Sequence, residues 1–194
     1  MSPLLLLLMG CAGAAPPEPG PGITLDGVVA SAPSGTRLAA QTATGSPAGA
    51  GEAAGVSGSL VAEATTPPLE VSAQRSTWDL RNGELHLEGD VVAVRGGARL
   101  RCTRADVRFD EDGLVTRIEA AGDVVLEQGA RIGQAQAALL EAGPGRVTLR
   151  GQASLAEPPH EMMGEPIVVY LDDERIECES CRMRIDGAGF GRGE

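Results

Sequence analysis

The central part of the chain alternates between apolar and polar residues with a period of two, which is the pattern of half-buried β-strands. The alternation runs from about Trp78 to Ile185 and is interrupted by short segments rich in Gly, Pro, Asp and Glu. Such segments form turns, and they lie at residues 95–97, 110–113, 128–130, 142–145, 157–160 and 172–174. They separate extended segments of roughly 10 to 14 residues, about twice the usual strand length. We therefore predict long antiparallel strands joined by hairpins.

A glycine-containing step recurs near the middle of these segments and predicts a bend. The phrases EGDVV, AGDVV and RGQAS each follow an alternating run. In the first segment Leu85 and Leu87 have one parity and Val92 and Val94 the other, so the inward face changes sides unless a bulge absorbs an extra residue. Strands that bend there would contribute to two facing sheets. The alternative is a plain β-sandwich with the glycines in turns.

Bent strands of this kind enclose an apolar trough, which is the candidate binding site. The residues expected to face it are Leu87, Val92, Val94, Leu100, Val107, Phe109, Ile118, Val124, Leu126, Ile132 and Leu139. Their apolar contacts would contribute about 25 cal/mol per Å² buried. Such a stack also leaves open strand edges, expected near residues 78–87 and 175–185, where another sheet can add.

The succession of motifs over residues 78–185 resembles the organic-solvent-tolerance-like (OstA/LptA) family of lipopolysaccharide-transport proteins. The motifs are GDVVAV, FDEDG, RIEAAGDVV and LRGQASL. The resemblance implies an all-β, V-shaped β-jellyroll of long bent antiparallel strands. It also implies a module that carries lipopolysaccharide or a related glycolipid through the periplasm with its acyl chains in the trough. Partners would be sister jellyroll domains of the transport path, joined by edge-strand pairing.

The N-terminal segment MSPLLLLLMGC resembles a bacterial lipobox, in which a signal peptide precedes a cysteine that receives lipid. On this interpretation residues 1–10 are the signal peptide and Cys11 is the lipidation site. A multi-chain lipid would anchor the protein stably to a membrane, and Ala12 after the cysteine favours the outer membrane by analogy with lipoproteins. The alternatives are an ordinary secretory signal or a chance Gly-Cys pair. The segment departs from the pattern in lacking Lys or Arg at its start.

Composition divides the remaining chain into three parts. Residues 11–68 are dominated by Ala, Gly, Pro, Ser and Thr, and such segments bury too little surface to offset their ordering entropy. We expect a lipid-anchored disordered tether there, a jellyroll domain over residues 69–186 and a flexible tail over residues 187–194.

The charge excludes one class of partner and leaves another open. The 194-residue chain has a net charge of −11 and 2% aromatic residues, so we expect no nucleic-acid partner. A cluster of arginines occurs around the first hairpin, at Arg95, Arg99, Arg101, Arg104 and Arg108. These residues would bind lipid phosphates or form a solvated face paired with Asp and Glu, and the second interpretation is the simpler one.

Neither the cysteines nor the histidines indicate catalysis. Cys178 and Cys181 lie three residues apart, about 10 Å in an extended strand, and too far for a disulfide unless the chain bends at Ser180. We expect Cys102, Cys178 and Cys181 to be buried, unreactive thiols; a Cys178–Cys181 bridge and metal or redox chemistry are the alternatives. His86 and His160 have no catalytic partner placed by spacing. We expect no enzyme activity, cofactor or metal.

The predicted function is therefore a non-enzymatic lipid-transport module. The alternative is a structural or scaffolding lipoprotein with the same fold and a closed core, which docks protein partners through its sheet edges without lipid cargo. A trough that stays open after packing, or a lipid that co-purifies, would distinguish the two.

Overall fold

The computed structural model describes residues 23–31, 34–45, 49–62, 66–79, 81–173 and 175–185. The described residues form one antiparallel sheet of fourteen strands. The strands are β1 (Ile23–Ser31), β2 (Arg37–Gly45), β3 (Ala50–Leu60), β4 (Leu69–Asp79), β5 (Glu84–Arg95), β6 (Ala98–Phe109), β7 (Val115–Gln128), β8 (Arg131–Glu141), β9 (Arg146–Arg150), β10 (Ser154–Glu157), β11 (His160–Gly164), β12 (Ile167–Tyr170), β13 (Ile176–Cys178) and β14 (Cys181–Ile185).

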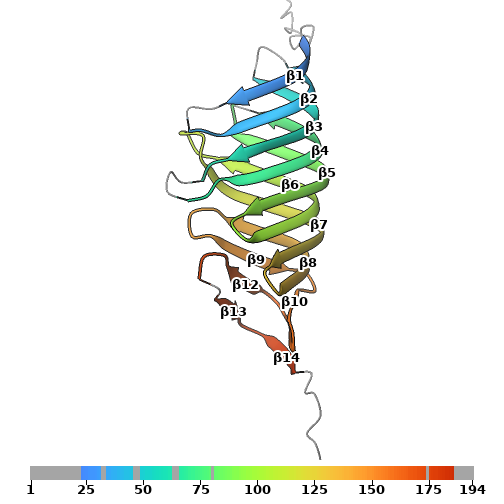
Figure 1. Ribbon diagram of the computed structural model, residues 1–194, viewed down its shortest axis with the longest axis vertical. Coiled ribbons are helices and arrows are strands. Elements are labelled where there is room, and N and C mark those ends of the chain that lie inside the picture. The colour runs from blue at the N-terminus through green and yellow to red at the C-terminus, as the bar shows by residue number, and fades with distance from the viewer. Residues whose placement is uncertain are drawn as a thin grey trace, which may run out of the picture.

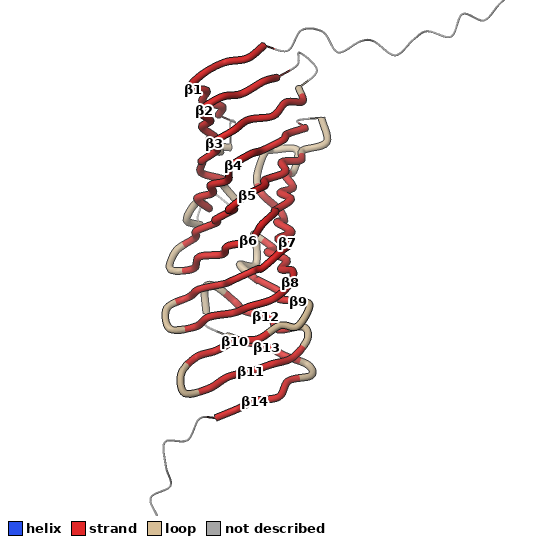
Figure 2. The backbone as a smooth tube through the Cα atoms, turned by 90° about the vertical axis from the view of Figure 1, so that its right-hand side faces the viewer, coloured by secondary structure: helices blue, strands red, loops and turns tan. Residues whose placement is uncertain are grey.

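The strands stack along the long axis, with β1 and β14 at opposite ends (Figures 1 and 2). Each long strand bends near its middle, so the sheet has two facing halves, which we call leaf one and leaf two. Leaf one contains, for example, the second half of β5 and the first half of β6, and leaf two contains their other halves. After β8 the strands are broken at the bend: β10, β11 and β14 continue leaf one, while β9, β12 and β13 continue leaf two. This is the V-shaped jellyroll expected from the sequence.

The bends occur at the glycine steps, as predicted. Gly89 and Asp90 have φ of 77° and 45°, and Gly122 and Asp123 have φ of 80° and 47°. This left-handed region strongly favours glycine, and Asp is one of the few other residues that enter it. Strand pairing is interrupted at the same places, between Glu88 and Val91 and between Ala121 and Val124. Each Gly-Asp pair therefore turns the strand from one leaf into the other.

A row of side chains on the alternate strands covers these glycines. Thr103 of β6 lies where a Cβ on Gly122 would be placed, 2.9 Å from the Thr103 Cβ, and Gln74 of β4 covers Gly89 in the same way. The Gln74 side chain also donates a hydrogen bond of 2.6 Å to Asp90. The same relation repeats along the stack in the pairs Gln41–Gly55 and Gln136–Gly151. The bend is thus built from a glycine on one strand and a polar side chain on the strand before it.

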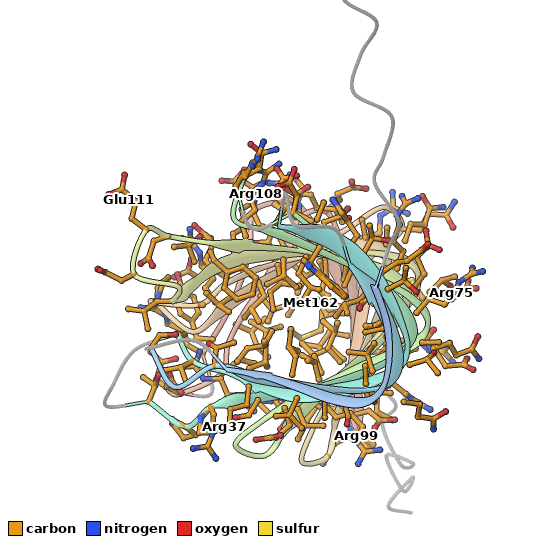
Figure 3. The ribbon with its side chains drawn as sticks, turned by 90° about the horizontal axis from the view of Figure 1, so that it is seen from above. Arg37, Arg75, Arg99, Arg108, Glu111 and Met162 are labelled. Carbon is orange, nitrogen blue, oxygen red and sulfur yellow. A yellow bond between two sulfur atoms is a disulfide. The ribbon has the colours of Figure 1, made fainter. Side chains whose placement is uncertain are left out.

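The interior between the leaves is apolar and continuous. One cluster of buried side chains extends from Leu60 to Val169, and Leu85, Leu87, Leu149 and Ile167 are fully buried within it. Viewed down the stack, Met162 lies toward the centre while Arg37, Arg75, Arg99 and Arg108 lie outside (Figure 3). Polar side chains therefore cover the outer faces and apolar ones fill the space between the leaves.

The prediction of a disordered tether over residues 11–68 is wrong for β1, β2 and β3. These strands extend the sheet N-terminally by pairing with β4 through residues 50–60. Their interior residues are small: Ala43, Ala53 and Val56 form a second buried cluster. Main-chain pairing to an existing sheet stabilises strands whose own side chains bury little surface. The first described strand thus begins at Ile23 rather than at residue 69, and the N-terminal edge of the described sheet is β1 rather than residues 78–87. Residues 1–22, with Cys11, and residues 186–194 lie outside the described residues.

Candidate functional site

The candidate site is the space between the two leaves, and six of the eleven predicted trough residues are buried in it. Leu87, Leu100, Val107, Ile118, Val124 and Leu126 are at most 8% exposed. Phe109 is partly buried and packs against the same cluster. These seven side chains come from β5, β6 and β7 at the centre of the stack, and their inward direction is as predicted. That they bind lipid stays a prediction.

The other four predicted trough residues do not face the interior. Val92 and Val94 alternate with the buried Val91 and Ala93, and therefore lie on the outer face of β5. The reason is the number of residues that the bend inserts. Between the buried residues Leu87 and Val91 the Gly-Asp pair inserts two residues rather than one, so the inward-facing positions of β5 remain odd-numbered after the bend.

In β8 the prediction that Ile132 and Leu139 face inward is wrong, because the neighbouring positions do so instead. Ile132 is 45% exposed and Leu139 is half-buried, whereas Gly133 and Leu140 point inward. Gly133 is inward because a Cβ there would lie 2.8 Å from the Leu149 side chain. A position in the core occupied by glycine gives no hydrophobic signal in the sequence, and this misleads an assignment based on large apolar residues.

The leaves are held together along their free ends, where the hairpins of the two leaves meet. We call this line the mouth. In the described part of the chain, five hydrogen bonds cross the mouth, each between a leaf-one residue and a leaf-two residue. They are Ser34 Oγ to Gly113 O (3.0 Å), Thr36 Oγ1 to Gly113 O (3.4 Å), Val115 N to Val61 O (2.8 Å), Arg95 Nη1 to Ala142 O (2.9 Å) and Gln128 Nε2 to Leu171 O (2.9 Å).

The trough is closed in this conformation. The cavity between the leaves measures about 20 Å³ and is lined by apolar side chains of β4 to β9, including Leu69, Leu100 and Leu140, together with Arg95. That volume accommodates about one water molecule, whereas pockets for small organic ligands are on the order of 300–1,000 Å³. An acyl chain therefore enters only if the leaves move apart and the hydrogen bonds across the mouth break.

Arg95 is the polar residue of the trough that the sequence did not distinguish from its neighbours. It is 6% exposed, in contrast to Arg99, Arg101, Arg104 and Arg108, which lie on the exposed side. The exposed arginines follow the predicted pattern of acid pairing: Arg101 contacts Glu127 at 2.7 Å and Arg108 contacts Glu84 at 2.5 Å. Arg95 has the odd parity of Leu85 and Leu87, and this shared parity is the sequence signal that could have identified it as inward-facing.

The outer face carries a polar hollow with different chemistry. It measures about 350 Å³ and lies over β2 to β5, lined by Glu52, Arg75, His86 and Glu88 among others. His86 is not isolated, because its Nδ1 lies 2.6 Å from Asp106 Oδ1 on the neighbouring strand. Arg75 and Glu88 form an exposed ion pair at 3.2 Å. Charged groups that pair with one another across exposed strands are the ordinary surface of such a sheet.

The cysteines differ from the main prediction. Cys178 and Cys181 form a disulfide with Cα atoms 5.9 Å apart, because the chain bends at residues 179–180 between β13 and β14. The bridge packs on Gly164, where a Cβ would lie 2.4 Å from Cys181 Sγ. Cys102 is a buried free thiol, as predicted, and its burial raises the pKa of the thiol from 9.0 to about 11.

Two other kinds of site are absent from the ranges that the structure describes. No group of three or more His, Cys, Asp or Glu side chains within these ranges is arranged to hold a metal ion. In the same ranges no helix has the length and apolar character needed to cross a membrane.

Comparison with known proteins gives two matches of different kinds. A family model described as "LptA/(LptD N-terminal domain) LPS transport protein" matches residues 70–175. The fold is similar to that of LptH, described as the LptA homologous periplasmic component of the conserved lipopolysaccharide transport device from Pseudomonas aeruginosa, with a TM-score of 0.56 and 19% sequence identity. That match covers 62% of this chain and 96% of the LptH chain. No curated protein matches the chain. The range matched by the family model runs from β4 through β12 and includes the strands that line the trough.

Proposed function

The chain belongs to the LptA/LptD N-terminal domain family of lipopolysaccharide-transport proteins, and from this premise we propose that it binds and passes lipopolysaccharide or a related glycolipid between its leaves. The acyl chains would lie in the trough and the sugars outside it. The module would act in the periplasm, in outer-membrane biogenesis, and without enzymatic chemistry. The observation that carries the proposal is the continuous apolar interior between two leaves that are joined covalently only at the bends.

The free energies involved support an interior that opens for an acyl chain. Each hydrogen bond across the mouth contributes about 1 kcal/mol net, and burying one methylene contributes about 0.8 kcal/mol. Breaking these five bonds is therefore offset by burying about six methylenes. Contacts between the leaves are lost on opening, but an inserted acyl chain replaces them with contacts of the same apolar kind.

We propose further that the sheet edges dock sister jellyroll domains. The edges are β1 at one end and β14, with β13 beside it, at the other. Edge strands present unpaired main-chain groups that another sheet can extend. β14 has a large apolar side chain on its surface, since Met183 is 60% exposed. A stack of modules joined in this way would align their troughs end to end.

The membrane anchor is a separate part of the proposal. Acylation of Cys11 would attach the module to the outer membrane. Cys11 precedes the first described strand, which begins at Ile23, by twelve positions in the sequence, so a lipid on Cys11 would keep the β1 end of the stack within about 40 Å of the membrane surface.

The scaffolding alternative is favoured by one specific observation, the closed interior of about 20 Å³. On that reading the leaves never separate, and the protein docks partners through its edges without lipid cargo. The two functions differ in whether the apolar interior exchanges its own contacts for those of a ligand.

Native mass spectrometry of the full chain, extracted in mild detergent, tests the proposal. We expect a fraction of the protein to carry one glycolipid, and oligomers to form through the edges. The control is a variant with Leu126→Glu, which places a charge in the trough, and it should lose the glycolipid while retaining the oligomers. Oligomers without glycolipid in both proteins would favour the scaffold.

A further inference from the structure

Arg95 has an incomplete set of partners for a guanidinium that is buried. Its side chain is 4% exposed. Nη1 donates to Ala142 O, but Nε and Nη2 have no hydrogen-bond partner. Buried charged groups are normally paired and fully hydrogen-bonded, because leaving them unsatisfied costs several kcal/mol. The two free donors therefore indicate a site that is completed by something else.

The surroundings of Arg95 define what the missing partner is. On one side the Arg95 side chain lines the apolar cavity, with Leu69, Leu100 and Leu126 on its wall. On the other side it reaches the mouth, where Ala142 and Asp172 lie on the opposite leaf. A partner with an acidic group at the mouth and an alkyl chain in the cavity would satisfy both. Nε and Nη2 of one arginine lie in the fork that binds phosphate or carboxylate through two parallel hydrogen bonds.

In the closed state the protein supplies a weak substitute for that acid. Asp172 Oδ2 lies 3.9 Å from Arg95 Nη2, beyond hydrogen-bond distance, and the Asp172 side chain is 66% exposed. The Asp172 carboxylate lies over Gly145, in the space that a Cβ at residue 145 would occupy. When the leaves separate, Arg95 stays on leaf one and loses both Ala142 and Asp172.

Gln128 also has a buried polar atom without a hydrogen-bond partner, its Oε1, and this atom lies at the mouth as well. Residues 95, 98 and 128 lie in one row across β5, β6 and β7. The Gln128 amide donates across the mouth to Leu171, and its Oε1 has no hydrogen-bond partner. A donor on the ligand, such as a hydroxyl, would complete it. The row therefore combines an anion-binding fork with a neutral acceptor.

We propose that Arg95 binds the acidic group of an amphiphile whose alkyl chain occupies the trough, and that Ala142 and Asp172 hold this site in the closed state. The inference rests on the proposed function, which it deepens by naming the ligand class as an anionic amphiphile. It also implies a sequence of events during opening. The acidic group of the ligand first replaces the contacts of Arg95 across the mouth, and the alkyl chain of the ligand then enters the cavity.

The test compares amphiphiles that share a twelve-carbon chain and differ in charge. Binding of dodecyl phosphate, dodecanoate and dodecyl maltoside to the full chain is measured by calorimetry below their micelle concentrations. We expect the phosphate or the carboxylate to bind at least about tenfold more tightly than the neutral maltoside, and the better of the two identifies the acid. Arg95→Gln should abolish this preference while leaving maltoside affinity within about twofold of wild type.

Two variants serve as control and safeguard. Arg99→Gln removes an exposed arginine on the other strand of the same hairpin, and this variant should keep the preference for the charged amphiphiles. Asp172→Asn leaves Arg95 in place but removes the competing carboxylate, so it should tighten dodecyl phosphate binding severalfold. This variant keeps the inference testable if Arg95→Gln fails to fold.

The outcomes separate the inference from the function on which it rests. If wild type binds all three amphiphiles equally, or Arg95→Gln keeps the preference, the Arg95 site is wrong and the trough stands. The Arg95 site is also wrong if Asp172→Asn leaves phosphate affinity unchanged. If wild type binds none of them, the lipid trough itself is overturned, and the Arg95 site with it.

Discussion

Gly122 illustrates how one residue sets the path of a whole strand. Its φ of 80° is followed by a φ of 47° at Asp123, and these two left-handed residues turn β7 from leaf two into leaf one. Thr103 of β6 packs directly over the glycine and donates a hydrogen bond of 3.3 Å to its carbonyl. A side chain at residue 122 would therefore encounter both backbone strain and a steric obstacle.

We predict that Gly122→Val lowers the free energy of unfolding by more than about 1 kcal/mol, because strain of this kind costs about 1–3 kcal/mol and the contact with Thr103 adds to it. Denaturant unfolding followed by circular dichroism measures the effect. Two hairpin glycines with no atom within 4 Å are matched controls. Gly129 has a φ of 60°, so Gly129→Ala measures the backbone strain without a steric contact. Gly97→Ala should change the stability very little. Equal stability of Gly122→Val and wild type would show that residue 122 does not form the bend.

Cys102 makes stability depend on pH in the alkaline range. Burial raises the pKa of its thiol from 9.0 to about 11 in the folded protein, so the folded state retains a proton that the unfolded chain has lost. The folded state therefore loses stability as pH rises from about 9 towards 11, by up to about 3 kcal/mol. Unfolding at pH 8 and pH 10.5 should show a larger loss for wild type than for Cys102→Ala. Parallel losses in the two proteins would contradict the assignment.

The inward residues of β6 and β7 could be predicted from the sequence, and those of β5 and β8 only in part. The period-two pattern identifies inward positions correctly within each half-strand, as at Leu87 and Leu126. It fails across a bend when the number of inserted residues is unknown. One inserted residue in β5 predicts that Val92 and Val94 face inward, whereas Gly89 and Asp90 supply two and place them outside.

At the scale of the elements, β1 to β3 show the limit of composition as a guide. Their alanines, glycines and threonines resemble a linker, yet Ala43, Ala53 and Val56 pack together and each strand pairs along its length with the next. One signal was available: Gly55, with a φ of 61°, continues the row of bend glycines and is covered by Gln41 as Gly89 is by Gln74. Pairing with β4 supplies the rest of the stability, and no local pattern reports it.

The last bend of the stack is formed by a disulfide in place of a glycine step. Between β13 and β14 the Cys178–Cys181 bridge closes the turn and lies against Gly164 of the neighbouring β11. The spacing of the two cysteines permits a bridge only if the chain bends between them, because an extended strand separates these positions by about 10 Å. Nothing in the local sequence pattern required that bend. The bridge thereby holds the C-terminal edge of the sheet in the bent shape of the other strands.

We predict that the double variant Cys178→Ser, Cys181→Ser loses about 2 kcal/mol of local stability, the amount expected for a very short closed loop. Hydrogen exchange resolves where the loss occurs. Amides of β13 and β14 should exchange faster, while those of β5 to β8 should be unchanged, and Cys102→Ala should leave β14 as in wild type. Faster exchange throughout the sheet would mean that the bridge stabilises the whole fold rather than its edge.

At the scale of the whole molecule, the mouth is a feature that the sequence alone could not reveal. Arg95 and Ala142 are 47 residues apart, and Gln128 and Leu171 are 43 apart. These contacts depend on how far each strand is displaced along the stack when it passes from one leaf to the other. The all-β class, the hairpins and the bends follow from local patterns, whereas the closure of the trough depends on the assembled sheet.

The position of the molecule relative to a membrane is tested at Cys11. We predict that Cys11→Ala releases the protein from the outer-membrane fraction, because the variant has no acceptor for the lipid. Fractionation of cells followed by a salt wash measures this, with Cys102→Ala as a control that should remain membrane-bound. Retention of Cys11→Ala after the wash would exclude a lipid anchor at this residue.

The central claim, that lipid occupies the space between the leaves, is tested most directly by site-specific photo-crosslinking in living cells. A photoreactive residue replaces either Leu100, which is 8% exposed in the trough, or its neighbour Arg101, which points outward. The account predicts that irradiation links lipopolysaccharide to residue 100 and not to residue 101. Equal labelling at both positions, or none at residue 100 in a folded protein, would contradict it.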